Sequence, residues 1–492
     1  MVPVLLILMP LITGLVTFFF KNEKAVRSWT LFSSLITLAV SVLGLTILKE
    51  EKYLQFHADW MQTLGSSFSV KLDGMGQLLC LLNAVAYPLV VLSTWNRPYK
   101  KPNNFFAHML LAQAGMMGVF LAMDALLFYF FWELALVPMY FLCSQWGGEK
   151  RIPVTFKFFI YTFIGSLLML VGILYVYNKT GDHSFAIESF YNAVLTNKEQ
   201  SFIFWLFFVA FAIKMPIFPF HTWQPDTYEQ APAATTMILS GVMVKMGILG
   251  LLRWLFPVLP FASFQWGDFI TCASLLGVVY ASLIAIRQDD LKRLVAYSSI
   301  AHMGLLCAAA FTQNSSGLQG LMIQLFNHGI NIIGLWIVVE LIERQLGTRK
   351  ISELGGLAQK APALGILLVI VALANIALPL TNAFPGEFLM FNGLFSSQTK
   401  YNVWFTVLAG MGIILGAVYT LNMIRRVFYG ETNALTAGAK DIQWNEKLGL
   451  GIIVIIIFWL GVYPQCMLNE TNAVSESIIK KFELLQINMQ KQ

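Results

Sequence analysis

The chain has 492 residues, of which 57% are hydrophobic and only 12% are charged, and its formal net charge is +6. Because soluble domains carry roughly 25% charged residues, this composition excludes a soluble globular protein and predicts an all-α protein that crosses a membrane many times. The Lys and Arg residues concentrate in alternate loops, so the positive charge indicates topology and not a nucleic-acid partner. By the positive-inside rule, the richer loops are expected in the cytoplasm and both termini on the outer, periplasmic side.

Segments of about 20 apolar residues can cross a bilayer as helices, and the chain contains about 14 of them. The polar stretch 49–74 is predicted to be a loop, with Asp73 as a cap of the helix that follows. Two groups of five spans, each with a broken helix in a corresponding place, predict two inverted five-helix repeats. The expected parts are residues 1–104 with spans 1–3, residues 105–256 with spans 4–8, residues 257–428 with spans 9–13, and residues 429–492 with span 14 and a C-terminal tail.

An acidic residue, Glu133, lies near the centre of the fifth span, residues 125–144. A carboxylate at that depth must be neutral, paired with a cation or in contact with water. We expect Glu133 to handle protons or to pair with a buried cation. The alternative is a hydrogen-bonding acid that only joins helices.

A lysine marks the predicted break in span 7. An uncharged run leads into Lys214, and Pro216 and Pro219 follow it directly. Prolines remove backbone donors and clash with the preceding turn, so helix 7 is expected to break here. A charge beside a broken helix is typical of ion pathways.

More ionisable residues follow this break. His221, Asp226 and Glu229 are expected at the cytoplasmic interface, either as solvated groups or as part of a conduction path. Lys245 lies nine residues into the eighth span, residues 236–256. At 1.5 Å per residue this depth is near mid-membrane, which disfavours the alternative that the lysine reaches back to the interface.

Spans 10 and 11 are unusually polar. Four residues of span 11 fall on one face of a helix at 100° per residue, and such a face must contact protein or water. We expect a hydrated relay, and the alternative is a purely structural set of hydrogen bonds. The polar residues are Ser298, Ser299 and His302 in span 10, and Gln324, Asn327, His328 and Asn331 in span 11.

The twelfth apolar segment, residues 362–395, is too long for one straight crossing. Pro379 and Pro385 interrupt it, and Glu387 lies at this second break. Helix 12 is therefore predicted to be broken in the same manner as helix 7, with a charge of the opposite sign.

The mid-membrane ionisable groups are predicted to form one proton-transfer series. Opening of a pair between Glu133 and Lys214 would release the lysine proton toward Lys245, and we expect this opening to act as a gate. No motif for a nucleotide, flavin, metal or iron-sulfur cluster is present, so no bound cofactor is expected. The series comprises Glu133, Lys214, Lys245, His302, His328 and Glu387.

Several strings closely resemble the antiporter-like subunits of respiratory complex I along essentially the whole chain. Glu387 is characteristic of subunit M, the homologue of mitochondrial subunit 4, because other antiporter-like subunits have lysine at this break. The chain departs from many relatives at Tyr228, where they have a PDAH-like string, so no histidine function is expected there. The strings are FFWELALVPMYFL, KMPIFPFHTWQPD, VKMGILGLLRW, LKRLVAYSSIAHMG, FNHGINI and FPGEF.

This resemblance implies that Glu133, Lys214, Lys245 and Glu387 are the key proton-channel residues, with His302 and His328 in a hydrated axis between them. It implies a non-redox, proton-translocating subunit of NADH:quinone oxidoreductase in the cell inner membrane. L-like and N-like subunits are its expected neighbours, and flavin, iron-sulfur clusters and quinone are expected in partner subunits. The alternatives are a subunit of a multi-subunit sodium/proton antiporter and the membrane subunit of a proton-pumping hydrogenase-type complex.

Overall fold

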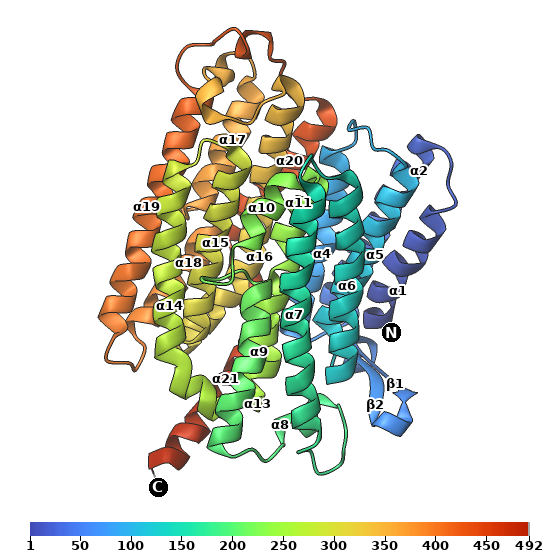
Figure 1. Ribbon diagram of the computed structural model, residues 1–492, viewed down its shortest axis with the longest axis vertical. Coiled ribbons are helices and arrows are strands. Elements are labelled where there is room, and N and C mark those ends of the chain that lie inside the picture. Colours follow the sequence, from blue (N-terminus) through green and yellow to red (C-terminus); the bar gives the residue numbers. More distant parts are fainter. Residues whose placement is uncertain (491–492) are drawn as a thin grey trace.

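Helices that run up and down between two ends build almost the whole protein (Figure 1). The computed structural model describes residues 1–490, and 11 of its helices are long and apolar enough to cross a membrane. Helix α1, helix α9 and the successive helices α17 and α18 supply the remaining predicted crossings. The N-terminal and middle helices are α1 (Val2–Thr17), α2 (Glu23–Thr46), α4 (Gly74–Ser93), α5 (Pro102–Leu121), α6 (Ala125–Trp146), α7 (Arg151–Tyr177) and α9 (Asn197–Lys214). The later helices are α14 (Pro260–Arg287), α15 (Leu291–Ala310), α16 (Ser315–Leu346), α17 (Pro362–Asn375), α18 (Ala383–Phe395), α19 (Asn402–Phe428), α20 (Trp444–Val462) and α21 (Gln465–Gln490).

A β-hairpin replaces the loop predicted between α2 and α4, so that prediction was wrong. Strand β1 (Gln55–Met61) pairs antiparallel with β2 (Ser66–Lys71). Side chains of β1 alternate between exposed and half-buried, which is the pattern of a strand with one covered face. The hairpin leads to Asp73, whose carboxylate accepts a hydrogen bond from the Gly76 N–H and caps α4 as predicted.

Two of the membrane crossings are interrupted. Helix α9 ends at Lys214, and helical structure resumes as α10 at Trp223–Gln230. Helix α17 ends at Asn375, and α18 begins at Ala383. Both interruptions place a short non-helical segment within the bundle (Figure 1).

The eighth span is a helix with two wider turns. It runs from Ala233 to Val258, and its α-helical parts α11, α12 and α13 are separated by π-helical turns at Leu239–Met243 and Leu251–Leu255. A π-helical turn inserts an extra residue, frequently at a functional site. Lys245 opens α12, directly beyond the first wide turn.

Helix α16 is the centre of the bundle. Its most apolar 18-residue window is wholly buried, whereas only 33% of the corresponding window of α19 is buried. Large apolar side chains on the outer helices are exposed, for example Ile414 and Leu421 on α19. Such an apolar outer surface is expected for helices that contact lipid or neighbouring subunits.

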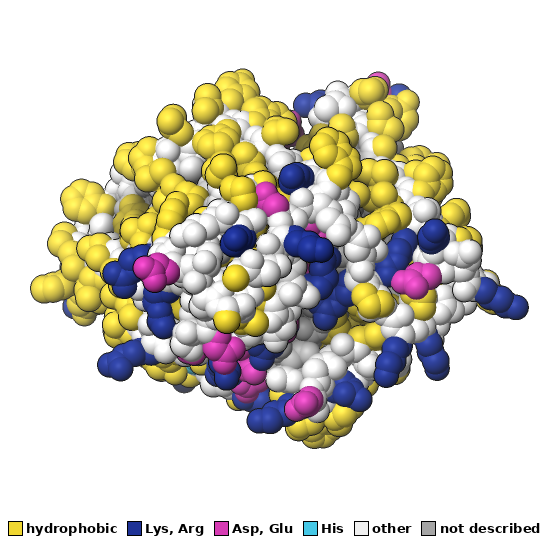
Figure 2. Space-filling model, turned by 90° about the horizontal axis from the view of Figure 1, so that it is seen from above, with side chains coloured by type: hydrophobic (Ala, Val, Ile, Leu, Met, Phe, Trp, Pro, Cys, Tyr) yellow, Lys and Arg dark blue, Asp and Glu magenta, His cyan; other side chains and the backbone are white. Residues whose placement is uncertain are grey.

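One end of the bundle carries many basic side chains. Figure 2 shows this end, with Lys and Arg side chains from its centre to the lower and right edges, interspersed with Asp and Glu, and hydrophobic side chains mainly at the left and upper edges. The chain begins away from this end, and α21 runs toward the opposite end (Figure 1).

Ion pairs at the basic end join α10 to the second half of the chain. Asp226 pairs with Lys157 at 2.8 Å, and Glu229 pairs with Arg293 at 2.9 Å and with Arg349 at 3.0 Å. Burial lowers the pKa of Arg349, but the nearby carboxylates of Asp290, Glu343 and Glu229 raise it by more. The net pKa is above its ordinary value, so this guanidinium stays charged. Asp226 and Glu229 are thus paired groups and not freely solvated ones.

Candidate functional site

Lys245 and His328 form the innermost contact of the site. The Lys245 ammonium donates to the Ser240 carbonyl at 2.7 Å and lies 2.9 Å from His328 Nδ1. Lys245 is 0% exposed and His328 is 2% exposed. The carbonyl five residues earlier comes within reach because a π-helical turn separates the two residues. The local geometry of the eighth span therefore aims the lysine at α16.

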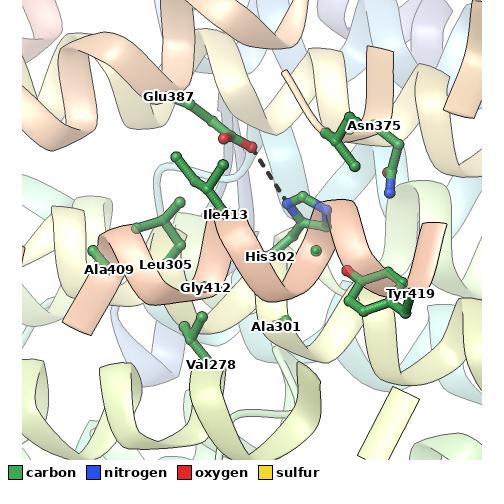
Figure 3. A pocket seen from close by; sticks show the side chains of 12 residues that line it. Val278, Ala301, His302, Leu305, Asn375, Glu387, Ala409, Gly412, Ile413 and Tyr419 are labelled. Atoms are coloured by element: carbon green, nitrogen blue, oxygen red, sulfur yellow. Dashed lines mark ion pairs between the residues drawn. The ribbon is translucent and has the colours of Figure 1, made fainter. Parts of the chain in front are cut away.

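The contact continues through a second histidine to the second helix break. The rings of His328 and His302 are 5.4 Å apart between centroids. His302 Nδ1 lies 3.5 Å from Glu387 Oε1, and Figure 3 shows this pair at one wall of a cavity. The Gln324 amide donates to the same carboxylate oxygen at 3.4 Å. Four of the six predicted site residues thus form one buried series.

Two residues that the sequence did not reveal line the same cavity. The Tyr419 hydroxyl donates to Ser298 Oγ at 2.9 Å, and the Asn375 amide donates to the same oxygen at 3.2 Å. Figure 3 shows Asn375, Tyr419 and His302 around a common space. Asn375 comes from α17 and Tyr419 from α19, whereas their shared partner Ser298 lies on α15, so no local pattern in any one segment could have indicated these two residues.

The polar face of α16 makes two kinds of contact. Asn327 donates to the Asn382 carbonyl at 2.7 Å, and Asn331 donates to the Ala374 carbonyl at 3.2 Å. These carbonyls lie at the interruption between α17 and α18, so the two amides stabilise the broken helix. His328 and Gln324 instead contact ionisable groups. Two of the four residues of the predicted polar face thus bond to backbone carbonyls, and two contact ionisable side chains.

Glu133 and Lys214 do not touch. Within residues 1–490, Lys214 Nζ and Glu133 Oε1 are both buried without a hydrogen-bond partner. Lys214 Nζ lies 5.3 Å from the centroid of the Trp132 ring. Lys214 is also the last residue of α9, where the helix dipole favours a cation. The structure thus shows no ion pair between the two predicted partners.

Buried polar atoms without a protein partner cluster along this series. They include the Nε2 atoms of His302 and His328, the side-chain oxygens of Gln324, Asn327 and Asn331, and Ser299 Oγ. Buried polar atoms ordinarily bind another group or an ordered water. These atoms therefore leave hydrogen-bonding positions along the series that the protein itself does not fill.

Within residues 1–490, no group of three or more His, Cys, Asp and Glu side chains is arranged to hold a metal ion. The five cysteines are free thiols. The site consists of acids, lysines, imidazoles and amides.

Comparisons with known proteins agree with the resemblance noted in the sequence. Residues 122–415 match the family described as NADH:quinone oxidoreductase/Mrp antiporter, TM. NADH-quinone oxidoreductase subunit M of Rickettsia typhi is 34% identical, over 97% of this chain and 98% of that protein. F(420)H(2) dehydrogenase subunit M of Methanosarcina mazei is 35% identical, over 97% and 98%.

The fold matches a solved structure over nearly its full length. A chain of respiratory complex I from Thermus thermophilus with bound NADH superposes with a TM-score of 0.91 at 27% identity, covering 98% of this chain and 100% of that chain. The family match covers more than half of the chain, and the relatives named above span almost all of it. The chain therefore belongs to the NADH:quinone oxidoreductase/Mrp antiporter family of membrane subunits, as a relative of subunit M.

Proposed function

We propose that this chain is a non-redox, proton-translocating subunit in the membrane arm of an NADH:quinone oxidoreductase. The observation that carries the proposal is the buried series in which Lys245, His328, His302 and Glu387 follow one another at short distances. Such a series of ionisable groups is costly inside a membrane protein and is typical of proton relays.

The second half of the site, which runs from Lys245 through His328 and His302 to Glu387, moves a proton by successive transfers between neighbouring groups. Lys245 donates toward His328 Nδ1, and an imidazole that accepts a proton at one nitrogen can release one from the other. A water molecule between the unpartnered Nε2 atoms of His328 and His302 would link the two rings. His302 then delivers the proton to Glu387.

The first half of the site, which consists of Glu133 and Lys214, supplies the gate. When Glu133 and Lys214 pair, the carboxylate stabilises the ammonium; when they separate, the lysine loses that stabilisation and gives up its proton more readily. The open pair seen in the structure is the releasing state of this cycle. Lys245 is the proposed receiver, because the helices that carry the two lysines pack closely: a Cβ at Gly247 would lie 2.7 Å from the Phe211 carbonyl oxygen.

Partner subunits supply the energy for this movement. We propose that flavin, iron-sulfur clusters and quinone lie in other subunits, that L-like and N-like subunits flank this chain, and that it resides in the cell inner membrane with both termini in the periplasm. The basic end of the bundle supports this orientation (Figure 2). The similarity to a subunit of an F(420)H(2) dehydrogenase is consistent with a function that does not depend on the electron donor.

Replacing Lys214 with Ala tests the proposal in membrane vesicles that contain the whole complex. We expect NADH-driven proton pumping to fall about tenfold or more, because the gate has lost its cation, while the complex remains assembled. Lys400→Ala is the control, since Lys400 is an exposed residue outside the membrane helices. Undiminished pumping and quinone reduction by the assembled Lys214→Ala complex would refute the proposed function.

A further inference from the structure

The ammonium of Lys214 packs against a tryptophan and not against a carboxylate. Its Nζ lies 5.3 Å from the centroid of the Trp132 ring. Lys214 is 2% exposed and Trp132 is 1% exposed, so this contact is shielded from bulk solvent. A cation over an aromatic face is attracted by the ring quadrupole, most strongly when the ring is an indole and the cation is desolvated.

The indole is held firmly in this position. Trp132 packs against Phe128, with ring centroids 5.5 Å apart, and against Phe211, at 5.9 Å. Phe211 is itself wedged against α12, because a Cβ at Gly250 would lie only 2.4 Å from its ring. In so closely packed a region, the indole cannot move away without repacking three helices.

Trp132 and Glu133 are consecutive residues of α6. Consecutive side chains project about 100° apart around a helix, so this turn of α6 presents an aromatic ring and a carboxylate as two distinct partners. Lys214 Nζ lies within cation–π distance of the first, while Glu133 Oε1 has no partner within residues 1–490. The two candidate partners of Lys214 therefore come from one turn of α6, and the lysine contacts the aromatic one.

We propose that Trp132 is a positioning residue that holds the Lys214 ammonium while the pair between Glu133 and Lys214 is open. This inference rests on the proposed function of Lys214 as the gate cation. Without the indole, opening the pair would leave an ammonium with no stabilising group in apolar surroundings. The ring lowers the free energy of the open state, so the pair opens often enough to support turnover.

A series of fluorinated tryptophans at position 132 tests this inference in the assembled complex. Each added fluorine weakens the negative potential of the ring face with little change in its shape, so a merely structural indole would tolerate the series. We expect proton pumping to fall stepwise with the number of fluorines, by about three- to tenfold over the full series. Proton pumping by the Trp132→Leu complex should fall at least as far. If that substitution prevents assembly, the fluorinated variants still test the inference.

Trp254 is the matched control. It is buried and packs on the same Phe128, with centroids 5.4 Å apart, and within residues 1–490 no lysine or arginine lies over its ring. The same fluorinated residues at position 254 should leave pumping unchanged. A flat response at position 132, or an equal fall at both positions, would overturn the inference. Loss of pumping in Lys214→Ala together with a flat fluorine series would reject the role of Trp132 and leave the proposed function standing.

Discussion

The two halves of the site solve the problem of a buried charge differently. In the second half, Lys245 contacts a carbonyl and an imidazole, and the series continues through His302 to Glu387. In the first half, the Lys214 ammonium lies over the ring of Trp132 and makes no contact with Glu133. The second half thus holds one hydrogen bond, between Lys245 and His328, and close approaches from His328 to Glu387, whereas the lysine and the acid of the first half make no contact.

This difference indicates a division of function. A continuous series passes a proton with small movements, because donor and acceptor already lie near each other. An interrupted pair needs a side chain to move first, which makes it suited to control. Variants in the second half should therefore remove transfer without disturbing the fold, and variants around the first half should affect packing and gating together.

The largest expected effect comes from Lys245→Ala. It removes the donor to His328, so proton pumping should fall about tenfold or more while the complex stays assembled. Proton pumping by the His328→Ala variant should fall by a similar factor. Pumping by the double variant should be no lower than that of either single variant, because both residues belong to one path.

Pumping in inverted membrane vesicles, normalised to the assembled complex, is the measurement for this cycle. Lys440→Ala is the control, since Lys440 is exposed in a loop at the basic end. If the losses in the double variant multiply, the two residues act independently and the second half is not one continuous path.

A smaller effect is expected from Gly250→Ala, which disturbs the first half. The new methyl group would meet the ring of Phe211 at 2.4 Å, and such overpacking lowers the free energy of unfolding by about 1–3 kcal/mol. Thermal unfolding of the solubilised complex measures the change. Gly451→Ala in α20 is the matched control, because a Cβ there meets nothing within 4 Å, and it should be neutral or slightly stabilising. Equal stability of the two variants would show that the aromatic packing around the first half is loose.

The smallest effect is expected at Arg349, whose ion pairs join α10 to the second half of the chain. Arg349→Ala should lower the free energy of unfolding by about 1 kcal/mol, because its partners are only partly buried. The loss should shrink as ionic strength rises, since salt screens exposed charges. Lys350→Ala, which breaks only an exposed pair with Glu353, should change nothing measurable. A salt-independent loss would mean that Arg349 acts through packing and not through charge.

The sequence predicts features that depend on near neighbours in the chain. The end of α9 at Lys214 follows from prolines directly after it, and the polar face of α16 follows from helical spacing. The π-helical turn before Lys245 has no such local signal, and the hydrogen bonds of Tyr419 and Asn375 join helices far apart in the chain. The β-hairpin was missed because its polar strand residues read as a loop.

The separation of Glu133 and Lys214 also lay beyond the sequence. Their residue types predict an ion pair, but whether that pair is open or closed depends on how α6 packs against α9 and on the aromatic rings between them. The inverted repeat and the division of the chain into two halves stay predictions from the pattern of spans. The expected broken crossings, by contrast, rest on single charged residues and prolines.

The wholly buried position of α16 constrains how this protein is made. A helix that carries Gln324, Asn327, His328 and Asn331 on one face is poorly suited to leave the insertion machinery alone into lipid. Helices synthesised earlier, such as α4 and α15, contact α16 in the finished fold and can shelter that face during biogenesis. Helices α18 and α20, which are synthesised later, complete the enclosure. The polar face that we propose for transport is thus also expected to make membrane insertion of α16 cooperative with the helices that follow it in the chain.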